Sequence, residues 1–487
     1  MENLTLFDFY KGIKDKKFTV SEVTSYYLNR IQNNDFSVKA FLEVFKESAL
    51  EEANKIDEEI NRGFDVSVLT GAPMAIKDNI LLKGKKSSAA SKILENHIAS
   101  YDATVISKLK KEGVIFLGRT NMDEFAFGGS TEFSAFKVTS NPHDLDRVPG
   151  GTSGGSAAAV ASNMALAALG TDTGGSVRQP ASFCGIVGLR PTYGAVSRYG
   201  VIAAASSFDQ VGTLTKTVTD AVVLFKSILG KSRFDSTSIK HNYDASFDKV
   251  LSLNDIKGKI FGIPKELWDK DNNKFLGVDN ETSLAMKEAR ESLENLGARF
   301  VEISIPSIDY SLACYYILIF AEESSNLSRF DGLRYAESIN KPHSLKELYR
   351  ANRSLGFGPE VKRRIILGNF VLSSGFYEAY YGRASKVREV IRADVKKALS
   401  LVEVLFMPTA PTVAYKKGEK LNDPLALYYG DIFTVLASLT GNPALTVPVR
   451  KYIVGSKVLP VGFQVVGKHF DEATLFQIGR AYERLVG

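Results

Sequence analysis

Apolar and polar positions along this chain follow a helical period at first and then alternate between helical and strand patterns. Residues 20–31 carry apolar side chains at helical spacing behind a capping-box pair, Thr19 and Glu22, which predicts a helix. A second helix is expected from Ser48 to Arg62, ending at a glycine. Residues 1–65 are therefore expected to form an N-terminal helical region.

Beyond this region, helical segments end at glycine and short apolar strands follow them. Residues 102–112 predict a helix that Gly113 ends before a strand at residues 114–117. The same order returns later, with a helix expected at 281–296 and an extended segment at 300–305. Helices that alternate with short apolar strands favour an α/β fold.

Glycine, serine and alanine are crowded between residues 149 and 200, with apolar, strand-like pieces among them. A glycine-rich stretch inside a folded region usually lets backbone approach backbone or ligand closely. Residues 310–400 become helical again, and we expect them to form an excursion over the core. Because no linker composition interrupts the chain, one domain over residues 1–487 is expected, with residues 66–230 as its core.

Composition restricts the class of protein more than it restricts the function. The chain has 487 residues, 44% hydrophobic and 24% charged, which is ordinary for a globular protein. Its net charge of +6 is small and spread along the chain, so contact with RNA is allowed but not indicated. No signal peptide and no run of roughly 18 apolar residues is found. The two cysteines, Cys184 and Cys314, form no CxxC pair, so we expect neither a zinc site nor a redox site. Together these features lead us to expect a cytoplasmic protein without a membrane function.

The candidate chemistry is concentrated in three glycine-containing segments. They are residues 71–79, 149–156 and 170–180. Neither a phosphate-binding GxxxxGK[ST] pattern nor a dinucleotide-binding GxGxxG pattern occurs in them, so nucleotide binding by these segments is not favoured.

A Ser-His-Asp triad is a second interpretation. The string GxSxG occurs around Ser153, but residues 144–149 before it predict a loop instead of the strand that a nucleophile elbow requires. Three of the five histidines follow the string, and none stands in a recognisable catalytic pattern. A Cys184 nucleophile is also conceivable, although its neighbours predict a buried apolar piece in which a thiol is usually inert.

A serine that is activated by a lysine is the third interpretation. A serine hydroxyl is a poor nucleophile until another group takes its proton. Lysine can take that proton only when it is neutral, and burial favours the neutral amine. Lys77 follows the apolar run 73–76, which predicts a strand that enters the core. Lys77 is therefore either a buried base or a solvated strand end.

Together the three segments resemble the amidase-signature family. The mark of that family is Gly-Gly-Ser-Ser-Gly-Gly followed by Asp-x-Gly-Gly-Ser-[Ile/Val]-Arg-x-Pro, and the match from Gly150 to Tyr193 is dense. The resemblance implies a large mixed β-sheet flanked by helices, and chemistry without a metal or an organic cofactor in this chain. It also implies a catalytic relay from Lys77 through a bridging residue on a cis peptide to a nucleophile; by position these two are Thr152 and Ser176.

The same resemblance implies that backbone N–H groups of the nucleophile loop stabilise an oxyanion, which explains the need for glycine there. The residues concerned are Thr173, Gly174 and Gly175.

The bridging position departs from the family pattern. The family has serine there, whereas this chain has Thr152, at the spacing to Ser176 that the pattern requires. Threonine keeps the hydroxyl, but its β-branch restricts χ1. The sequence leaves open whether Thr152 serves as the bridge or breaks the relay.

Segments outside the amidase core resemble one group within the family, the amidase subunits of tRNA-dependent amidotransferases. These segments are residues 121–131, 325–332, 356–364 and 372–377. The resemblance implies glutamine as the amide, with Arg364 on its α-carboxylate, Asp431 on its α-ammonium and Tyr315 as a third contact.

The resemblance also implies partners. It suggests a heterotrimer in which a B subunit binds most of the misacylated tRNA and uses ATP and Mg²⁺, together with a small C subunit. The ammonia would amidate Glu-tRNA(Gln), Asp-tRNA(Asn) or both. Two other functions stay open: a free-standing amidase that acts on small amides, and a non-catalytic scaffold subunit in which Thr152 has broken the relay.

Overall fold

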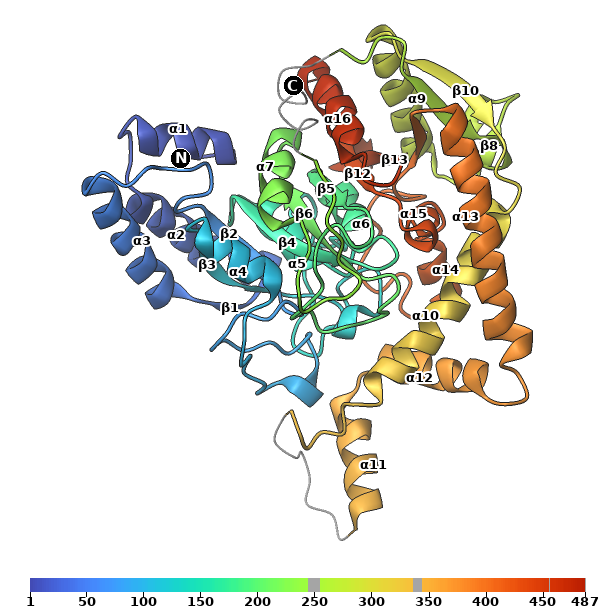
Figure 1. The fold of residues 1–487 in the computed structure, drawn as a ribbon, viewed down its shortest axis with the longest axis horizontal. Helices are drawn as coiled ribbons and strands as arrows, with labels where there is room; N and C mark the ends of the chain where they lie inside the picture. Colours follow the sequence, from blue (N-terminus) through green and yellow to red (C-terminus); the bar gives the residue numbers. More distant parts are fainter. Residues whose placement is uncertain (244–254, 336–343, 455, 487) are drawn as a thin grey trace.

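The computed structural model describes residues 1–243, 255–335, 344–454 and 456–486. Its N-terminal region begins with helices, as expected (Figure 1). They are α1 (Leu6–Lys14), α2 (Val20–Val38) and α3 (Lys46–Asn61). The predicted capping box opens α2, because the Thr19 hydroxyl accepts from the Glu22 amide at 3.1 Å and the Glu22 carboxylate accepts from the Thr19 amide at 2.8 Å. A short strand, β1 (Phe41–Val44), also lies in this region, where periodicity predicted only helix.

Eleven strands of the described chain form one mixed sheet. From edge to edge they are β1, β3 (Ile115–Thr120), β2 (Pro73–Lys77), β4 (Ala167–Asp172), β6 (Gln210–Thr215), β5 (Val187–Arg190), β12 (Ala444–Val454), β13 (Lys457–Gly467), β11 (Val404–Pro408), β7 (Ile260–Pro264) and β10 (Arg299–Ile303). A separate hairpin pairs β8 (Trp268–Asp269) with β9 (Lys274–Phe275). The expected large mixed sheet is thus confirmed, and it takes strands from nearly the whole length of the chain.

Helices pack around this sheet (Figure 1). They are α4 (Thr104–Lys111), α5 (Gly154–Ala161), α6 (Arg178–Cys184), α7 (Val218–Ile228), α9 (Asn280–Asn295) and α16 (Glu472–Val486). Two short helices, α14 (Pro424–Tyr429) and α15 (Val435–Thr440), follow β11 in the chain. The predicted helix–glycine–strand units are confirmed to within two or three residues as α4 followed by β3 and α9 followed by β10. At the glycine of the first unit, Gly113, φ is +78°, which suits a residue without a side chain.

The expected helical excursion is also present. It consists of α10 (Ser311–Leu327), α11 (Leu345–Gly356), α12 (Pro359–Leu372) and α13 (Arg383–Leu401). Figure 1 shows these helices along one side of the molecule, with α11 farthest from the sheet. Because α10 packs against α12, α13 and α15, the excursion is joined to the core near the carboxyl-terminal strands.

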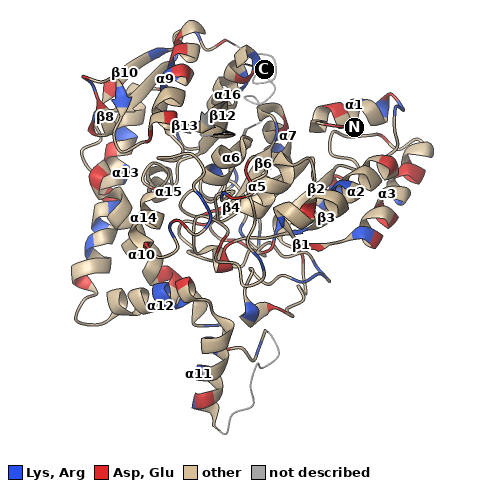
Figure 2. Ribbon diagram, turned by 180° about the vertical axis from the view of Figure 1, so that it is seen from behind, with Lys and Arg blue, Asp and Glu red and all other residues tan. Residues whose placement is uncertain are grey.

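Acidic and basic residues are interspersed over the outer helices, including α3, α9 and α13 (Figure 2). The small positive charge of the chain is therefore not gathered on one side of the ribbon. Among the described residues, no helix combines the length and the hydropathy that crossing a membrane requires.

Candidate active site

Three parallel strands position the first and third glycine-containing segments of the site. β2 lies between β3 and β4 and runs parallel to both, so the carboxyl ends of all three strands meet at one edge of the sheet. Lys77 is the last residue of β2 and is completely buried. Its Nζ donates to Thr152 Oγ1 at 2.7 Å and to Thr171 Oγ1 at 2.9 Å. The lysine that the sequence singled out is therefore buried and directed at the bridging residue.

Burial lowers the pKa of Lys77 to about 7. The carboxylates of Asp123, Asp172 and Asp209 oppose this shift, because negative charge favours the ammonium form. A large fraction of Lys77 is thus neutral near pH 7, which a general base requires.

Thr152 lies in the loop before α5, and the peptide bond between Gly151 and Thr152 is cis. The side chain is fully buried, and its rotamer directs the hydroxyl at the Lys77 amine. The β-branch is thus compatible with this contact. A Cβ on Gly151 would overlap the Asp123 carboxylate, so the loop can pass this point only with glycine.

Ser176 lies in the turn between β4 and α6 and is 7% exposed. The amide of Ser153 donates to the Ser176 carbonyl at 3.1 Å, which holds the Thr152 loop beside the Ser176 turn. Within the described chain, the Ser176 hydroxyl makes no hydrogen bond. The structure therefore brings Lys77 and Thr152 into hydrogen-bond contact, whereas a hydrogen bond from Ser176 to Thr152 is not made.

The predicted oxyanion loop presents unpaired backbone donors. The N–H groups of Thr173, Gly174 and Gly175 donate to none of the residues that the structure describes. A Cβ on Gly174 would overlap the Tyr315 hydroxyl, and one on Gly175 would overlap the Thr434 hydroxyl. At Gly175 φ is also +145°, a conformation that disfavours other residues. Glycine at these two positions thus lets Tyr315 and Thr434 pack against the loop whose N–H groups are unpaired.

A buried ion-pair network that sequence reasoning missed holds this turn. Arg178 grips the Asp172 carboxylate with Nε and Nη2, both at 3.0 Å, and Arg190 Nη1 donates to the same carboxylate at 2.8 Å. Burial alone would raise the pKa of Asp172, but the two guanidinium groups hold it well below its usual range. The signals in the sequence were the presence of charged residues inside a stretch of small and apolar ones, and the fixed places of Asp172 and Arg178 in the family pattern.

Arg364, on α12, is 3% exposed and does not lie on a solvated helix face. Its Nε donates to Glu360 at 2.8 Å, and its Nη1 donates to Glu323 at 3.0 Å. Burial raises the pKa of Glu323 to about 8, although Arg364 opposes the shift. Two buried carboxyl groups thus contact Arg364, and its Nη2 makes no hydrogen bond to a described residue.

Asp431 lies half-buried between α14 and α15, and its Oδ2 accepts from the Tyr316 hydroxyl at 2.7 Å. The Tyr316 ring lies 5.9 Å from the guanidinium of Arg364 and packs edge-on against Tyr315. Burial raises the pKa of Asp431 to about 7, against the effect of the Tyr316 hydrogen bond and of Arg364.

Tyr315 connects this charge pair to the nucleophile turn. Burial raises the pKa of its hydroxyl well above the usual range; Asp431 adds to the shift and Arg364 opposes it. Because that hydroxyl lies over Gly174, the three residues predicted to bind substrate gather beside the predicted nucleophile. Tyr316, Glu323 and Glu360, which hold the charges in place, were not predicted, because their spacing in the sequence indicates only helix.

The competing interpretations find no support in the geometry. The Ser153 hydroxyl donates to the carbonyl of Thr171 and accepts from its amide, so its hydrogen bonds hold backbone together. Cys184 is buried, and burial raises the pKa of its thiol. Among the described residues, no group of histidine, cysteine and acidic side chains is arranged to hold a metal ion.

Comparisons with known proteins identify the family of the chain. The family model described as Amidase matches residues 22–476. A relative from Thermoanaerobacter pseudethanolicus, named as the A subunit of glutamyl-tRNA(Gln) amidotransferase, is 47% identical over 99% of this chain and 96% of the relative. One of the same name from Carboxydothermus hydrogenoformans is 48% identical over 97% and 95%.

Solved structures extend the comparison. The crystal structure of the glutamyl-tRNA(Gln) amidotransferase A subunit from Thermotoga maritima aligns with a TM-score of 0.78 and 40% identity over 99% of this chain and 94% of that one. A peptide amidase from Stenotrophomonas maltophilia aligns with a TM-score of 0.81 and 26% identity, over 100% and 97%.

Proposed function

The chain belongs to the amidase family, and on that premise we propose that it is the glutamine-hydrolysing subunit of a tRNA-dependent amidotransferase. Its reaction releases ammonia from glutamine, and the complex uses that ammonia to convert Glu-tRNA(Gln) into Gln-tRNA(Gln). Relatives named as A subunits of this amidotransferase are 46–48% identical over nearly the whole of both chains, which supports the assignment.

The observation that carries the proposal is a pair of opposite charges beside the nucleophile turn. Glutamine differs from a simple amide by its α-carboxylate and α-ammonium groups. Arg364 supplies the cation and Asp431 supplies the anion. Both lie near Tyr315, whose hydroxyl covers Gly174. A small neutral amide has no use for either charge, so a free-standing amidase is less favoured.

In the proposed mechanism, Lys77 acts as the final base. Its neutral amine takes the proton of the Thr152 hydroxyl, which in turn takes the proton of Ser176 as Ser176 Oγ attacks the amide carbon. The backbone N–H groups of Thr173, Gly174 and Gly175 stabilise the oxyanion that forms. The contact of 2.7 Å between Lys77 and Thr152 supports the first of these proton transfers.

Collapse of the tetrahedral intermediate breaks the carbon–nitrogen bond. The proton returns through Thr152 to the departing nitrogen, and ammonia leaves. Water then attacks the acyl-enzyme with the same relay as its base, which releases glutamate and restores Ser176. Because the Thr152 hydroxyl contacts Lys77 at 2.7 Å, the scaffold interpretation, in which Thr152 breaks the relay, is less favoured.

The proposal includes partner subunits. Amidation of a tRNA-bound carboxylate requires its activation, which we assign to a B subunit that uses ATP and Mg²⁺ and binds most of the tRNA. A small C subunit completes the heterotrimer. Because relatives are named as subunits, we expect the chain to work in such a complex.

Replacement of Asp431 by asparagine tests the choice of glutamine. Asparagine keeps an acceptor for the Tyr316 hydroxyl but removes the charge that the α-ammonium needs, at a cost of about 1.5–3 kcal/mol. We expect KM for glutamine to rise about tenfold to a hundredfold, while kcat/KM for a small neutral amide stays unchanged. Steady-state ammonia release with both substrates gives the comparison.

Asp309→Asn is the matched control, because Asp309 is exposed and makes no hydrogen bond to a described residue. It should leave KM for glutamine unaltered. If Asp431→Asn changed the kinetics of both amides equally, Asp431 would not recognise the α-ammonium and the choice of glutamine would lose its main support.

The pH dependence should separate the base from the substrate contact. Lys77 must lose a proton near pH 7 to act as a base, and Asp431 must lose one near pH 7 to bind an ammonium, so both effects raise kcat/KM as pH increases. Below pH 7 we expect log(kcat/KM) to rise with a slope of about two for glutamine and about one for a neutral amide. Asp431→Asn should reduce the slope for glutamine to about one. A flat profile for the neutral amide from pH 5.5 to 8.5 would be incompatible with Lys77 as the base.

A further inference from the structure

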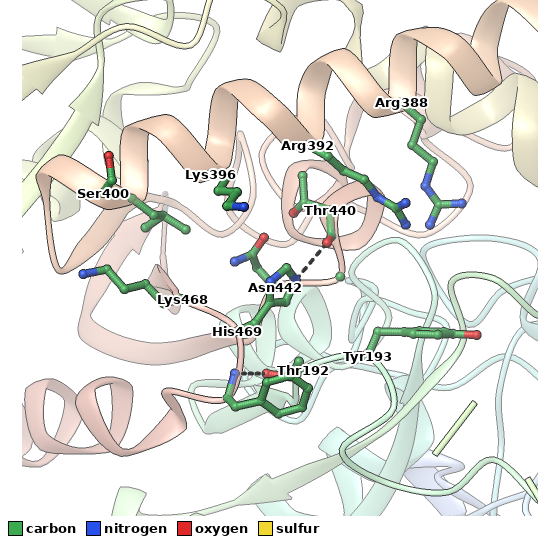
Figure 3. Close-up of a pocket in the computed structure, with 13 residues that line it drawn as sticks. Thr192, Tyr193, Arg388, Arg392, Lys396, Ser400, Thr440, Asn442, Lys468 and His469 are labelled. Atoms are coloured by element: carbon green, nitrogen blue, oxygen red, sulfur yellow. Dashed lines mark hydrogen bonds between the residues drawn. The ribbon is translucent and has the colours of Figure 1, made fainter. Parts of the chain in front are cut away.

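A cavity that the proposed mechanism does not use is bounded by α13 and by the loops at residues 440–442 and 468–470 (Figure 3). Its volume is about 770 Å³, within the range of small-molecule sites. None of Lys77, Thr152 and Ser176 lines it. The cavity is therefore distinct from the candidate active site.

Cations line this cavity from two directions. Arg388, Arg392 and Lys396 stand four residues apart on α13, so they share one face of that helix. Lys468 approaches from the loop after β13. Figure 3 shows Lys396 directed toward the loop that carries His469, and Arg388 and Arg392 directed toward the side of the cavity on which Tyr193 lies. The space between α13 and this loop is thus basic on both sides.

Much of this positive charge is uncompensated. Arg392 pairs with Glu389 at 2.7 Å, and Arg388 donates to the Leu439 carbonyl at 2.9 Å. Lys396 and Lys468, in contrast, make no ion pair and no hydrogen bond with any residue that the structure describes. No carboxylate is among the described residues that line the cavity. Like charges that are held together without counter-charges indicate an anionic ligand.

The remaining lining suits an organic anion better than a bare one. Leu399 and Phe470 supply apolar surface, and Tyr193 supplies an aromatic ring. Asn442 donates from Nδ2 to the Gly467 carbonyl, and its carbonyl oxygen makes no hydrogen bond to a described residue. An anion-binding side next to an aromatic side is the arrangement that a nucleotide needs, because its phosphates and its base lie at opposite ends.

We propose that this cavity binds a free nucleoside polyphosphate, with the phosphates on Lys396, Lys468 and Arg392 and the base against Tyr193 and Phe470. The volume accommodates one such molecule, and the two unpaired lysines line it, one from α13 and one from the loop after β13. The cavity is open to solvent on one side, and its volume matches one free nucleotide; a short RNA is the alternative that the test separates. The site is separate from glutamine hydrolysis, so the proposed function could fail without affecting this proposal.

Isothermal titration calorimetry of the full chain, alone and with its partner subunits, tests the proposal with ATP, ADP, AMP, inorganic triphosphate and adenosine. We expect the chain alone to bind one ATP or ADP saturably, AMP and triphosphate more weakly, and adenosine not at all. In the complex, where the B subunit binds ATP of its own, we expect one ATP more than in the complex that carries the Lys396→Gln/Lys468→Gln double variant. Lys396→Gln and Lys468→Gln should each weaken ATP binding about tenfold, since a hydrogen bond to a charged group is lost. Lys396→Arg should keep the affinity.

Lys397→Gln is the matched control, because Lys397 is the adjacent exposed lysine on α13 and does not line the cavity. It should bind ATP like the unaltered chain. The three variants in which a lysine is replaced, Lys396→Gln, Lys468→Gln and Lys397→Gln, should all keep the rate of ammonia release and the melting temperature of the unaltered chain. The proposal is wrong if millimolar ATP does not bind to the chain, or if the Lys396→Gln/Lys468→Gln double variant binds as the control does. It is also wrong if the cavity does not bind ATP once the partner subunits are present. A short RNA that binds there while free nucleotides do not would overturn it as well.

Discussion

Ammonia release from glutamine is expected to fall by about four orders of magnitude or more when Ser176 is replaced by alanine. The reason is that no acyl-enzyme can form without the Ser176 oxygen. The oxyanion donors of Thr173, Gly174 and Gly175 would still bind the substrate, and only the residual catalysis of such donors would remain. The measurement is ammonia release by the purified chain with its partner subunits and charged tRNA.

Ser153→Ala is the informative control for this loss. Ser153 occupies the GxSxG string, but its hydroxyl bonds to the backbone of Thr171. We expect this variant to retain ammonia release within about tenfold, because only a structural hydrogen bond is removed. The opposite pattern, with activity lost in Ser153→Ala and kept in Ser176→Ala, would replace the serine–lysine assignment by a triad. Amidation of tRNA from free ammonium should survive in both variants, which verifies that the complex is folded.

Thr152→Val is expected to lower kcat for glutamine hydrolysis by about a thousandfold, within the range for loss of general acid–base catalysis. Valine keeps the β-branched shape of threonine but lacks the hydroxyl that accepts from Lys77 at 2.7 Å. Protons then have no path between Ser176 and the lysine. The measurement is kcat at saturating glutamine, beside the thermal stability of the same preparation.

Thr152→Ser is the matched control, since it restores the residue that the family pattern has at this position. It should keep kcat within a few-fold of the unaltered chain, because the hydroxyl is retained and only a methyl group is lost. Full activity in Thr152→Val would mean that Ser176 passes its proton by another path. Loss of activity in Thr152→Ser as well would mean that the methyl group positions the loop.

Much of the fold could be predicted from local pattern. The helix α2 begins at its capping box, and α4 and α9 end near glycine, because caps and glycine act within a few residues. The strand β1 was missed, since its four residues acquire extended structure from pairing with β3, which is distant in sequence. Tertiary pairing of this kind overrides local propensity.

The candidate site was predictable where motif and chemistry coincide. Lys77 was a candidate because it ends an apolar run, and Ser176 was a candidate because of its position in the family pattern. The residues that hold them were not, because Asp172, Arg178 and Arg190 form a network whose members lie up to 18 residues apart and become partners only through folding. Spacing in the sequence does not reveal which buried charges will neutralise one another.

The sequence by itself determined the order of helices and strands, the position of the glycines and the types of chemical group that are available. The tertiary structure decided which of these groups meet. Burial lowers the pKa of Lys77, because removal of water penalises its ammonium form, and this suits the base that we propose it to be. The packing of α10 against α12 and α15 brings Tyr315, Arg364 and Asp431 together from three separate segments of the chain. Local pattern acts over a few residues, whereas a pKa and a binding site depend on everything that the fold places within a few ångströms.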